Sequence, residues 1–279
     1  MGSGNKDSLT VEESIDVPHN RAGLVVMSLN EQVRGFWEQE PCGTSQHIVG
    51  ELEPRSLAWF EQVEEFRYSV EPFIHSVAQF TRHHGKKILE VGVGAGTGHL
   101  QWARAGAQCH GVDLTDAAIE TTAARLAVYG FKSNLRRIDA ELLPFPDNSF
   151  DVVYSWGVIH HSENPGQIIE EIRRVLKPGG VFIGMMYGRR SPTVFKVWVK
   201  HGLLKGKPWR SFKDVLWNHV ESVGTKAYTV SELQALFSTF ESLSAKPIIT
   251  TYDTDKWPTW LSSLFPDQWG WFITLKATK

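Results

Sequence analysis

Glycines and a carboxylate stand close together near the middle of the chain. Gly92, Gly94 and Gly96 follow an apolar stretch, and Glu90 comes two residues before the first of them. Because glycine tolerates positive φ and has no side chain, such a loop allows a ligand to approach the backbone closely. The charge of Glu90 would repel a pyrophosphate and attract a cationic group. The loop therefore predicts a ligand that carries positive charge.

Two more carboxylates follow the next predicted strands. Asp113 lies about 20 residues beyond the glycines, where a carboxylate accepts both hydroxyl groups of a ribose. Asp139 ends the third strand, and the apolar residues near it suit an adenine ring. A dinucleotide is disfavoured, because its fingerprint requires Gly or Ala five positions after the first glycine and here that position is Thr97. Together these positions predict a nucleoside ligand.

A histidine pair, His160 and His161, follows the fourth predicted strand. Ligands of open parallel sheets bind at the carboxyl ends of the strands, so the pair is placed to act as a general base on an acceptor hydroxyl or amine. The alternative for each ring is a structural hydrogen bond to nearby backbone. An acceptor that is already nucleophilic, such as a thiolate, would need no base.

The two cysteines provide no framework for a metal or a disulfide. Cys42 and Cys109 are far apart and lie in no ligand-like spacing, so no metal site is expected and a reducing cytoplasm fits best. Cys109 falls within a strand and is expected in the core. Cys42 is expected to be a small buried thiol, with a position that faces the acceptor as the alternative.

Alternating strand and helix patterns position these residues. The predicted strands cover residues 87–91, 108–113, 135–138, 150–155 and 181–186, and the predicted helices cover 100–105, 116–129 and 165–176. Such units imply a parallel sheet covered on both faces. A capping box at Thr229–Glu232 predicts a helix to about residue 240. Strands at 247–252 and 269–275 are expected to form an antiparallel edge, and the best N-terminal helices are 55–68 and 72–82.

Five motifs in this order resemble the class I S-adenosylmethionine-dependent methyltransferases of the UbiE and sterol-methyltransferase type. The resemblance covers roughly residues 86 to 187 and rests on Ile88–Gly96, Gly111–Asp113, Asp139–Ala140, Val158–His161 and Leu176–Gly180. It implies an α/β fold: a Rossmann-like, doubly wound seven-stranded sheet, mostly parallel with an antiparallel last strand. Residues 35–44 and 219–228 also resemble a widespread bacterial branch of such enzymes, which brings no substrate with it.

The resemblance implies an enzyme of the EC 2.1.1 class that transfers a methyl group from S-adenosyl-L-methionine to a small-molecule acceptor by in-line displacement, with S-adenosyl-L-homocysteine as product. The protein then mainly orients donor and acceptor and excludes water. The alternatives are a non-catalytic S-adenosylmethionine-binding protein and a nicotinamide oxidoreductase, which Glu90 and Thr97 disfavour. The expected catalytic residues are His160 and His161, and the expected cofactor-binding residues are Tyr68, Glu90, Gly92, Val93, Gly94, Gly96, Asp113, Leu114, Asp139, Ala140, Glu141, Ser155 and Trp156.

Two of these aromatic residues have a second interpretation. Tyr68 resembles a family position that reaches over the cofactor, and otherwise it is an interface aromatic. The ring of Trp156 would attract a sulfonium by a cation–π interaction, and otherwise it packs in the core.

The composition changes near residues 85 and 188. We expect an N-terminal helical cap at 1–85, a cofactor-binding core at 86–188, a lid or acceptor-binding insertion at 189–228, and a C-terminal helix and strands that complete the sheet at 229–279. Residues 189–226 carry nine Lys or Arg against Asp214 and Glu221, interleaved with apolar residues.

The basic, apolar segment has three interpretations. It is a lid over an apolar or anionic acceptor, a surface that touches a membrane to collect a lipid-like acceptor, or a solvated basic face over packed aromatics. The tryptophans that follow favour either an aromatic-walled cavity or, as the commoner case, core packing; they are Trp257, Trp260, Trp269 and Trp271.

The formal net charge of −2 gives no general attraction to nucleic acid, which we do not expect as a partner. No signal peptide or membrane span is predicted, membrane contact is the minor alternative, and the oligomeric state is left open. Met1–Gly4 is interpreted as a cloning scar, and Lys6 stands where myristoylation requires Ser or Thr.

Overall fold

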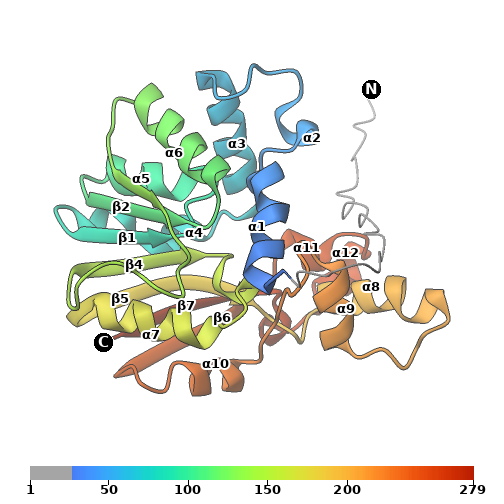
Figure 1. Ribbon diagram of the computed structural model, residues 1–279. Coiled ribbons are helices and arrows are strands. Elements are labelled where there is room, and N and C mark those ends of the chain that lie inside the picture. Colours follow the sequence, from blue (N-terminus) through green and yellow to red (C-terminus); the bar gives the residue numbers. More distant parts are fainter. Residues whose placement is uncertain (1–26) are drawn as a thin grey trace.

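The computed structural model describes residues 27–279, so the interpretations of Met1–Gly4 and Lys6 lie outside the described residues. A seven-stranded sheet with the order β3-β2-β1-β4-β5-β7-β6 runs through the centre of this part of the chain (Figure 1). All neighbouring strands are parallel except β7, which is antiparallel to both β5 and β6. The predicted fold class, with its antiparallel last strand, is confirmed. The strands are β1 (Lys87–Val91), β2 (Gln108–Asp113), β3 (Asn134–Arg137), β4 (Phe150–Trp156), β5 (Leu176–Tyr187), β6 (Ser242–Ile248) and β7 (Phe272–Thr278).

The central strands form where the sequence is almost continuously apolar. In β4 every residue but Asp151 is buried, as expected of a strand covered on both faces. β5 begins at Leu176, earlier than predicted, and includes Lys177–Gly180. Its register with β4 is irregular between Phe150 and Val152, where the chain accommodates Pro178 and two glycines.

Helices cover both faces of the sheet. α7 (Pro165–Val175) and α10 (Val230–Leu236) pack on one face, where Ile172 and Leu233 join a core cluster with Phe182 of β5. On the other face Trp102 of α5 (Thr97–Arg104) packs with Tyr154 of β4. α6 (Asp116–Val128) lies beside α5 and contacts β2 and β3. α10 is the helix predicted to end near residue 240, and it ends at Leu236.

The boundaries predicted for the last two strands are wrong. Residues 250–252 are not strand, because Thr250 forms a capping box with Asp253 and begins the short helix α11 (Thr251–Thr254). β7 begins after Gly270, where the backbone passes so close to β6 that a Cβ would stand 2.2 Å from the carbonyl oxygen of Ile248. Similarly, the helix predicted at 72–82 breaks at Gln79, whose φ is +52°, into α4 (Ile74–Ala78) and the 3₁₀ helix η1 (Phe80–His83).

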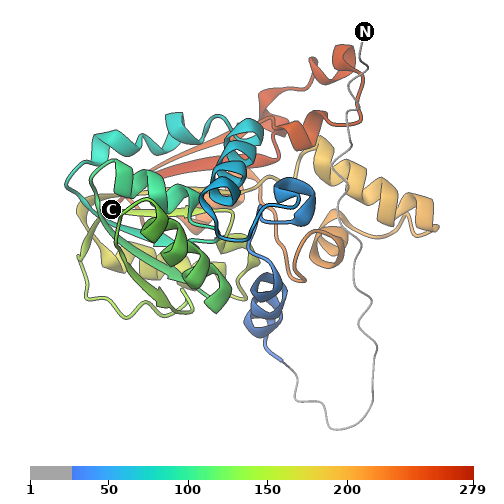
Figure 2. The ribbon, with the colours of Figure 1, turned by 90° about the horizontal axis from the view of Figure 1, so that it is seen from above.

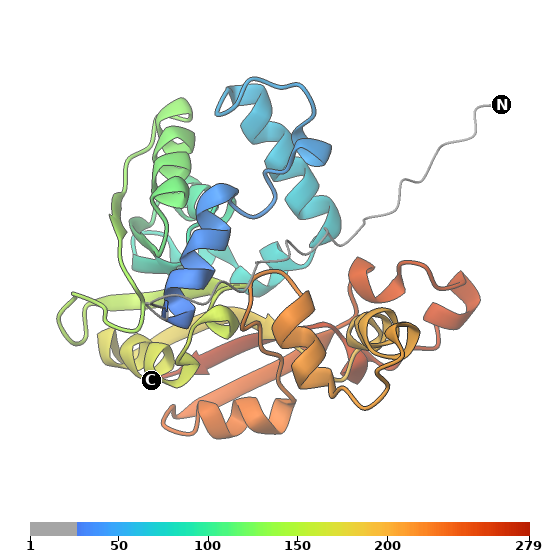
Figure 3. The same ribbon diagram turned by 45° about the vertical axis from the view of Figure 1, so that its right-hand side comes forward.

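Several further helices lie beyond the carboxyl ends of the parallel strands. In Figures 1 and 3 the parallel strands point toward the side that carries α1, α8, α9, α11 and α12. Seen from above, α8 extends away from the sheet (Figure 2). Among residues 27–279 no helix combines the length and the apolar character that crossing a membrane requires. The helices of the described residues not yet given bounds are α1 (Leu29–Gln39), α2 (Gln46–Val49), α3 (Leu57–Val70), η2 (Ile159–His161), α8 (Pro192–His201), η3 (Leu203–Lys205), α9 (Phe212–His219), α12 (Thr259–Ser262) and η4 (Asp267–Trp269).

The four late tryptophans do not share one environment. Trp271 is buried and stacks on Tyr187, with ring centroids 4.1 Å apart. Trp260 is 70% exposed and Trp269 is 45% exposed. Neither a common core cluster nor a common cavity wall describes the group, because the segment that carries Trp260 projects beyond the sheet edge.

Candidate functional site

The glycine loop after β1 uses its three glycines for different reasons. All three have positive φ: +82° at Gly92, +52° at Gly94 and +76° at Gly96. A Cβ on Gly92 would stand 2.1 Å from the side chain of Val158, and one on Gly96 would stand 2.9 Å from Thr122 of α6. Among the described residues no atom lies within 4 Å of the corresponding position on Gly94. The turn is therefore packed at both ends and open in the middle, where a ligand can approach the backbone.

A buried arginine, which was not among the predicted site residues, bonds the backbone of this loop. Arg125 of α6 donates to the carbonyl oxygens of Ala95, at 2.7 Å, and Phe60 of α3, at 3.2 Å. Its guanidinium also lies over the Phe60 ring and pairs with Glu64. Because one side chain bonds both segments, α3 and the glycine loop are held together.

The carboxylate of Glu90 lies beneath the loop and is paired with a histidine. Nδ1 of His99 is 2.9 Å from a Glu90 oxygen, and both side chains are buried. The other ring nitrogen of His99 bonds the hydroxyl of Ser133 at 2.8 Å. Burial raises the pKa of Glu90, while the His99 hydrogen bond opposes that shift. A Cβ on Gly98 would stand 2.9 Å from Glu90. The glycine at position 98 was therefore a sequence sign of this close contact that the motif comparison did not use.

Asp113 closes β2 and bonds directly to the glycine loop. One carboxylate oxygen accepts the N–H of Gly94 at 3.1 Å, and the other accepts the N–H of Thr115 at 3.0 Å and its hydroxyl at 2.8 Å. Burial raises the pKa of Asp113, and the backbone N–H groups counteract it by stabilising the charged form. The oxygen that accepts from Gly94 retains unused acceptor capacity. The structure thus brings Gly94 and Asp113 together as the motif spacing predicts.

An open pocket of about 660 Å³ lies next to this carboxylate. Leu114, Ile138 and Asp139 line it from the strand ends, and Asn30 and Arg34 line it from α1. Its size is in the usual range of small-molecule sites. Two of the predicted cofactor positions, Leu114 and Asp139, therefore face one pocket, and α1 covers it.

Asn30 is the residue by which α1 reaches the third strand end. Its side-chain amide donates to Asp139 at 2.9 Å and to Glu141 at 2.8 Å, and its oxygen accepts the N–H of Glu163 at 2.7 Å. The same Glu141 oxygen also accepts the Ser162 hydroxyl. Glu141 is thus held by protein donors. The sequence analysis missed Asn30, because its partners lie more than a hundred positions away.

The other predicted cofactor residues have varied surroundings. The Tyr68 hydroxyl donates to the carbonyl of Thr97 at 3.4 Å, at the start of α5 directly after the glycine turn. Its reach over the cofactor stays a prediction. The buried Ser155 hydroxyl donates to the Val91 carbonyl at 2.9 Å and joins β4 to β1. The side chain of Val93 is buried, and that of Ala140 packs against the core, which leaves mainly their backbone for a ligand.

Trp156 is buried at the end of β4. Its indole N–H donates to Glu71 at 2.6 Å, and its ring stacks on Tyr154. Glu71, in turn, pairs with Arg67 at 3.3 Å. These contacts account for the tryptophan by packing and hydrogen bonding, while its cation–π role stays a prediction.

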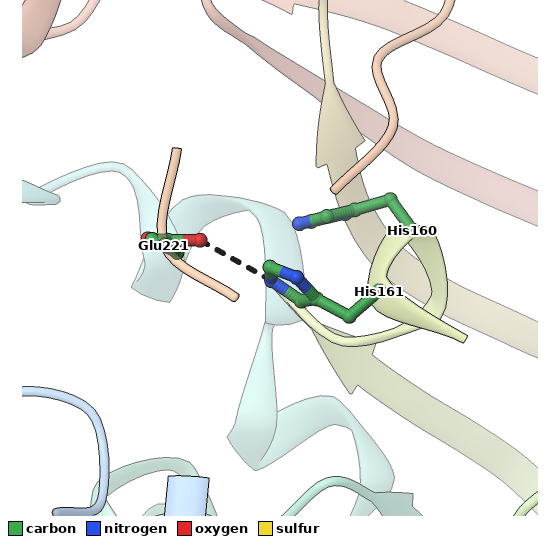
Figure 4. Close-up of side chains that lie close together, drawn as sticks. All are labelled: His160, His161 and Glu221. Carbon is green, nitrogen blue, oxygen red and sulfur yellow. Dashed lines mark ion pairs between the residues drawn. The ribbon is translucent and has the colours of Figure 1, made fainter. Parts of the chain in front are cut away.

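The histidine pair lies in η2, directly after β4, and both rings are buried. The His160 ring packs on Tyr187 at 3.9 Å between centroids. Nε2 of His161 is 3.2 Å from a carboxylate oxygen of Glu221, as Figure 4 shows. Both oxygens of Glu221 accept the Tyr187 hydroxyl at 3.0 Å. The sequence analysis did not assign Glu221 to the site.

Cys42, in the loop after α1, lies near charged groups of this site. Burial raises the pKa of its thiol to about 11, and the charges of Arg67, Glu221 and Glu71 also act on it. We call these four residues the Cys42 cluster. The expectation of a buried core thiol at Cys42 is wrong, because the residue has exposed surface. Cys109 is half-buried in β2, and burial raises its thiol pKa to about 12.

The sheet order, the glycine loop after β1 and the carboxylates after β2 and β3 agree with the fold that the resemblance to class I S-adenosylmethionine-dependent methyltransferases implies. Comparison with known families agrees for the central part of the chain: residues 89–184 match the family described as "Methyltransferase domain".

Named relatives match parts of the chain. The chain is 35% identical to the fatty-acid O-methyltransferase of Mycolicibacterium smegmatis over 132 aligned residues, and the alignment covers 47% of each protein. The chain is 31% identical to the sterol 24-C-methyltransferase of Yarrowia lipolytica over 188 aligned residues, and this alignment covers 64% of the chain and 46% of the relative. The chain thus spans about half the length of these curated relatives.

Solved structures show the same fold at lower identity. A methyltransferase from Methanosarcina mazei superposes with a TM-score of 0.54 at 20% identity, over 75% of this chain and 97% of the other. The cyclase SpnF superposes with a TM-score of 0.56 at 18% identity, over 93% of this chain and 99% of the other.

Proposed function

We propose that this protein transfers a methyl group from S-adenosylmethionine to a small-molecule acceptor. The observation that carries the proposal is the bonded pair of Gly94 and Asp113: the N–H of the open glycine turn lies 3.1 Å from a carboxylate oxygen that can still accept a ribose hydroxyl. The adjoining pocket at Leu114 and Asp139 has room for an adenine ring. When bound, S-adenosylmethionine supplies the methyl group and the leaving sulfide.

The surroundings of this site support the cofactor assignment residue by residue. Arg125 and Asp113 hold the glycine loop in one conformation, so little ordering remains for binding. Tyr68 bonds the residue directly after the turn and, in this proposal, reaches over the cofactor and helps to exclude water.

The acceptor side is proposed to be the Cys42 cluster together with the 189–228 insertion. The insertion combines cations with exposed apolar residues, since Leu204 is 74% and Trp209 is 77% exposed. Such a surface suits an apolar or anionic acceptor, and the relatives named for fatty acids and sterols agree with an apolar one. His161 contacts Glu221 of this cluster, and His160 and His161 are the proposed candidates for contact with the acceptor. We expect neither nucleic acid as a partner nor a location outside the cytoplasm.

Calorimetry with S-adenosylhomocysteine tests the cofactor site. We expect the wild type to bind and Asp113→Asn to bind about 10- to 150-fold more weakly, which corresponds to the loss of about 1.5–3 kcal/mol for a charged hydrogen bond. Asp267→Asn, a surface change in η4, is the matched control and should bind as the wild type does. Absence of binding to the wild type, or equal affinity of the Asp113 variant, would refute the assignment.

A non-catalytic or differently catalytic role is the second candidate, because the neighbour SpnF is named as a cyclase and one fold hosts many chemistries. Incubation of methyl-labelled cofactor with a metabolite extract separates the two. Label in a small molecule supports methyl transfer. Tight S-adenosylhomocysteine binding without any transfer of label supports the second candidate.

A further inference from the structure

His160, His161 and Glu221 bring three metal-ligand groups together away from the glycine loop. Ligand atoms of all three lie within 4.8 Å of one another (Figure 4). The histidines come from η2, and the glutamate comes from the loop after α9, where it has a φ of +52°. A non-glycine residue in this region costs free energy that other interactions must offset. The loop therefore holds the Glu221 carboxylate against the histidines.

The contacts around His161 leave one ring nitrogen without a hydrogen bond. Nδ1 lies 3.1 Å from the Thr225 hydroxyl and 3.0 Å from the Ser222 hydroxyl, so it has a partner in either tautomer. Nε2 is 3.2 Å from a carboxylate oxygen of Glu221, yet it has no hydrogen-bond partner among the described residues. A metal ion between Nε2 and the carboxylate would satisfy both groups.

His160 adds a second unsatisfied ring. Its ring is fully buried, and among residues 27–279 neither of its nitrogens has a hydrogen-bond partner. An unsatisfied buried polar group costs about 1–3 kcal/mol. One metal ion can bind a nitrogen of His160, Nε2 of His161 and the Glu221 carboxylate together.

We propose that His160, His161 and Glu221 bind one divalent transition-metal ion of the zinc class. Neighbouring ligands of a tetrahedral zinc ion lie about 3.3 Å apart when the bonds are about 2.0–2.1 Å, and the pair His161–Glu221 already has this spacing at 3.2 Å.

The outer contacts fit the same interpretation. The second nitrogen of a metal-binding histidine is normally hydrogen-bonded, and Nδ1 of His161 has the Thr225 and Ser222 hydroxyls within reach. A ligating carboxylate is normally hydrogen-bonded too, as Glu221 is by Tyr187. Three protein ligands leave at least one position for a water molecule or an anionic group. A contribution of the metal to acceptor binding would rest on the proposed function, but metal binding itself does not.

Titration with Co²⁺ after chelator treatment, on protein without an affinity tag, tests the site. We expect one Co²⁺ per chain with a visible ligand-field absorption that Zn²⁺ abolishes by competition. Glu221→Gln keeps the shape of the side chain and should weaken Co²⁺ binding by at least about 10- to 100-fold, the loss that even an outer-shell change causes. His160→Gln should have the same effect.

His201→Gln is the control for adventitious binding, because His201 and His219 form another stacked pair in the described chain, with centroids 4.1 Å apart. It should leave the Co²⁺ affinity unchanged. No stoichiometric Co²⁺ binding, or equal affinity in Glu221→Gln, overturns the metal site. The same variants are also titrated with S-adenosylhomocysteine. Unchanged affinity shows that they are folded, and this measurement tests the proposed cofactor site independently of the metal site.

Discussion

The described residues contain two histidine–glutamate pairs with similar distances and different completeness. In the first pair, near the glycine loop, His99 contacts Glu90 on one side and Ser133 on the other, so both ring nitrogens have partners. In the second pair, at η2, His161 has a partly exposed carboxylate on one side and two hydroxyls on the other, and the adjoining His160 ring has no hydrogen-bond partner among the described residues.

The difference teaches how a structural pair can be separated from a ligand site. In the pair near the glycine loop, both ring nitrogens of His99 have hydrogen-bond partners, and the pair joins β1 to α5. In the pair at η2, Nε2 of His161 lies near Glu221 without a hydrogen bond, and the adjoining His160 ring is unsatisfied among the described residues. We call the first pair closed and the second pair open. A closed pair stabilises the fold by itself, whereas an open pair needs a further group, such as the proposed metal ion, to satisfy its polar atoms.

The strongest way to break this comparison is to remove one histidine at a time. His99→Leu leaves Glu90 buried without its partner, and we expect a loss of about 3–5 kcal/mol in the free energy of unfolding. Because burial raises the pKa of Glu90, the variant should recover part of that loss as the pH falls and the carboxyl binds a proton. Denaturant titration at two pH values measures both effects.

His161→Leu is the matched change at the open pair. Glu221 is one-third exposed by its side chain and keeps its bond to Tyr187, so in metal-free protein we expect a smaller loss, about 1–2 kcal/mol. A loss as large as that of His99→Leu would show that both pairs are structural and that the comparison fails.

A second comparison uses pH to separate the insertion from the sheet. Burial lowers the pKa of His201 to about 4, below the value of about 6.5 for an unfolded histidine. Protonation therefore favours the unfolded state, and stability is lost as the pH falls from about 6.5 toward 4. We expect hydrogen exchange in α8 and α9 to accelerate at pH 5 before that in β1 and β4. His201→Phe keeps a stacking ring without a titrating group and should reduce the acid effect by about 1 kcal/mol. Unchanged acid sensitivity in that variant would argue against the histidine.

The smallest expected effect concerns the contact that joins the insertion to α10. A hydrogen bond from Arg189 lowers the pKa of Glu232 to about 2. Arg189→Gln should return that pKa toward its ordinary value, which carboxyl resonances in an NMR titration would report. The stability that the pair adds is present above about pH 4 and is lost as the pH falls toward 2. Because Glu232 is 40% exposed, we expect the loss at neutral pH to stay below about 1 kcal/mol.

Local patterns explain what the sequence could predict. The glycine turn, Asp113 and the central strands follow from spacing and apolar runs of a few residues, and the structure has them where they were expected. The strand predicted at 247–252 failed because Thr250 is β-branched, which favours a strand, yet its side chain caps a helix.

Contacts between distant segments explain what was missed. Asn30 and Glu221 act on partners far away in the sequence, Arg125 reaches two carbonyl groups from the middle of a helix, and a single sequence records none of these meetings. Lys279 is a similar case, since its ammonium group bonds the carbonyl oxygens of Arg174 and Leu176.

The place of β7 in the sheet has a consequence for the order in which the protein assembles. β7 is the last strand of the described residues, yet it lies between β5 and β6, and within this part of the chain β6 pairs with no other strand. Until β7 is synthesised, β6 cannot pair with the sheet. The edge of β5 also stays unpaired until β7 follows, about 85 residues later. Loop closure over that distance is slow compared with forming the βα units, so the first half should collapse early while β5 remains open to wrong pairing.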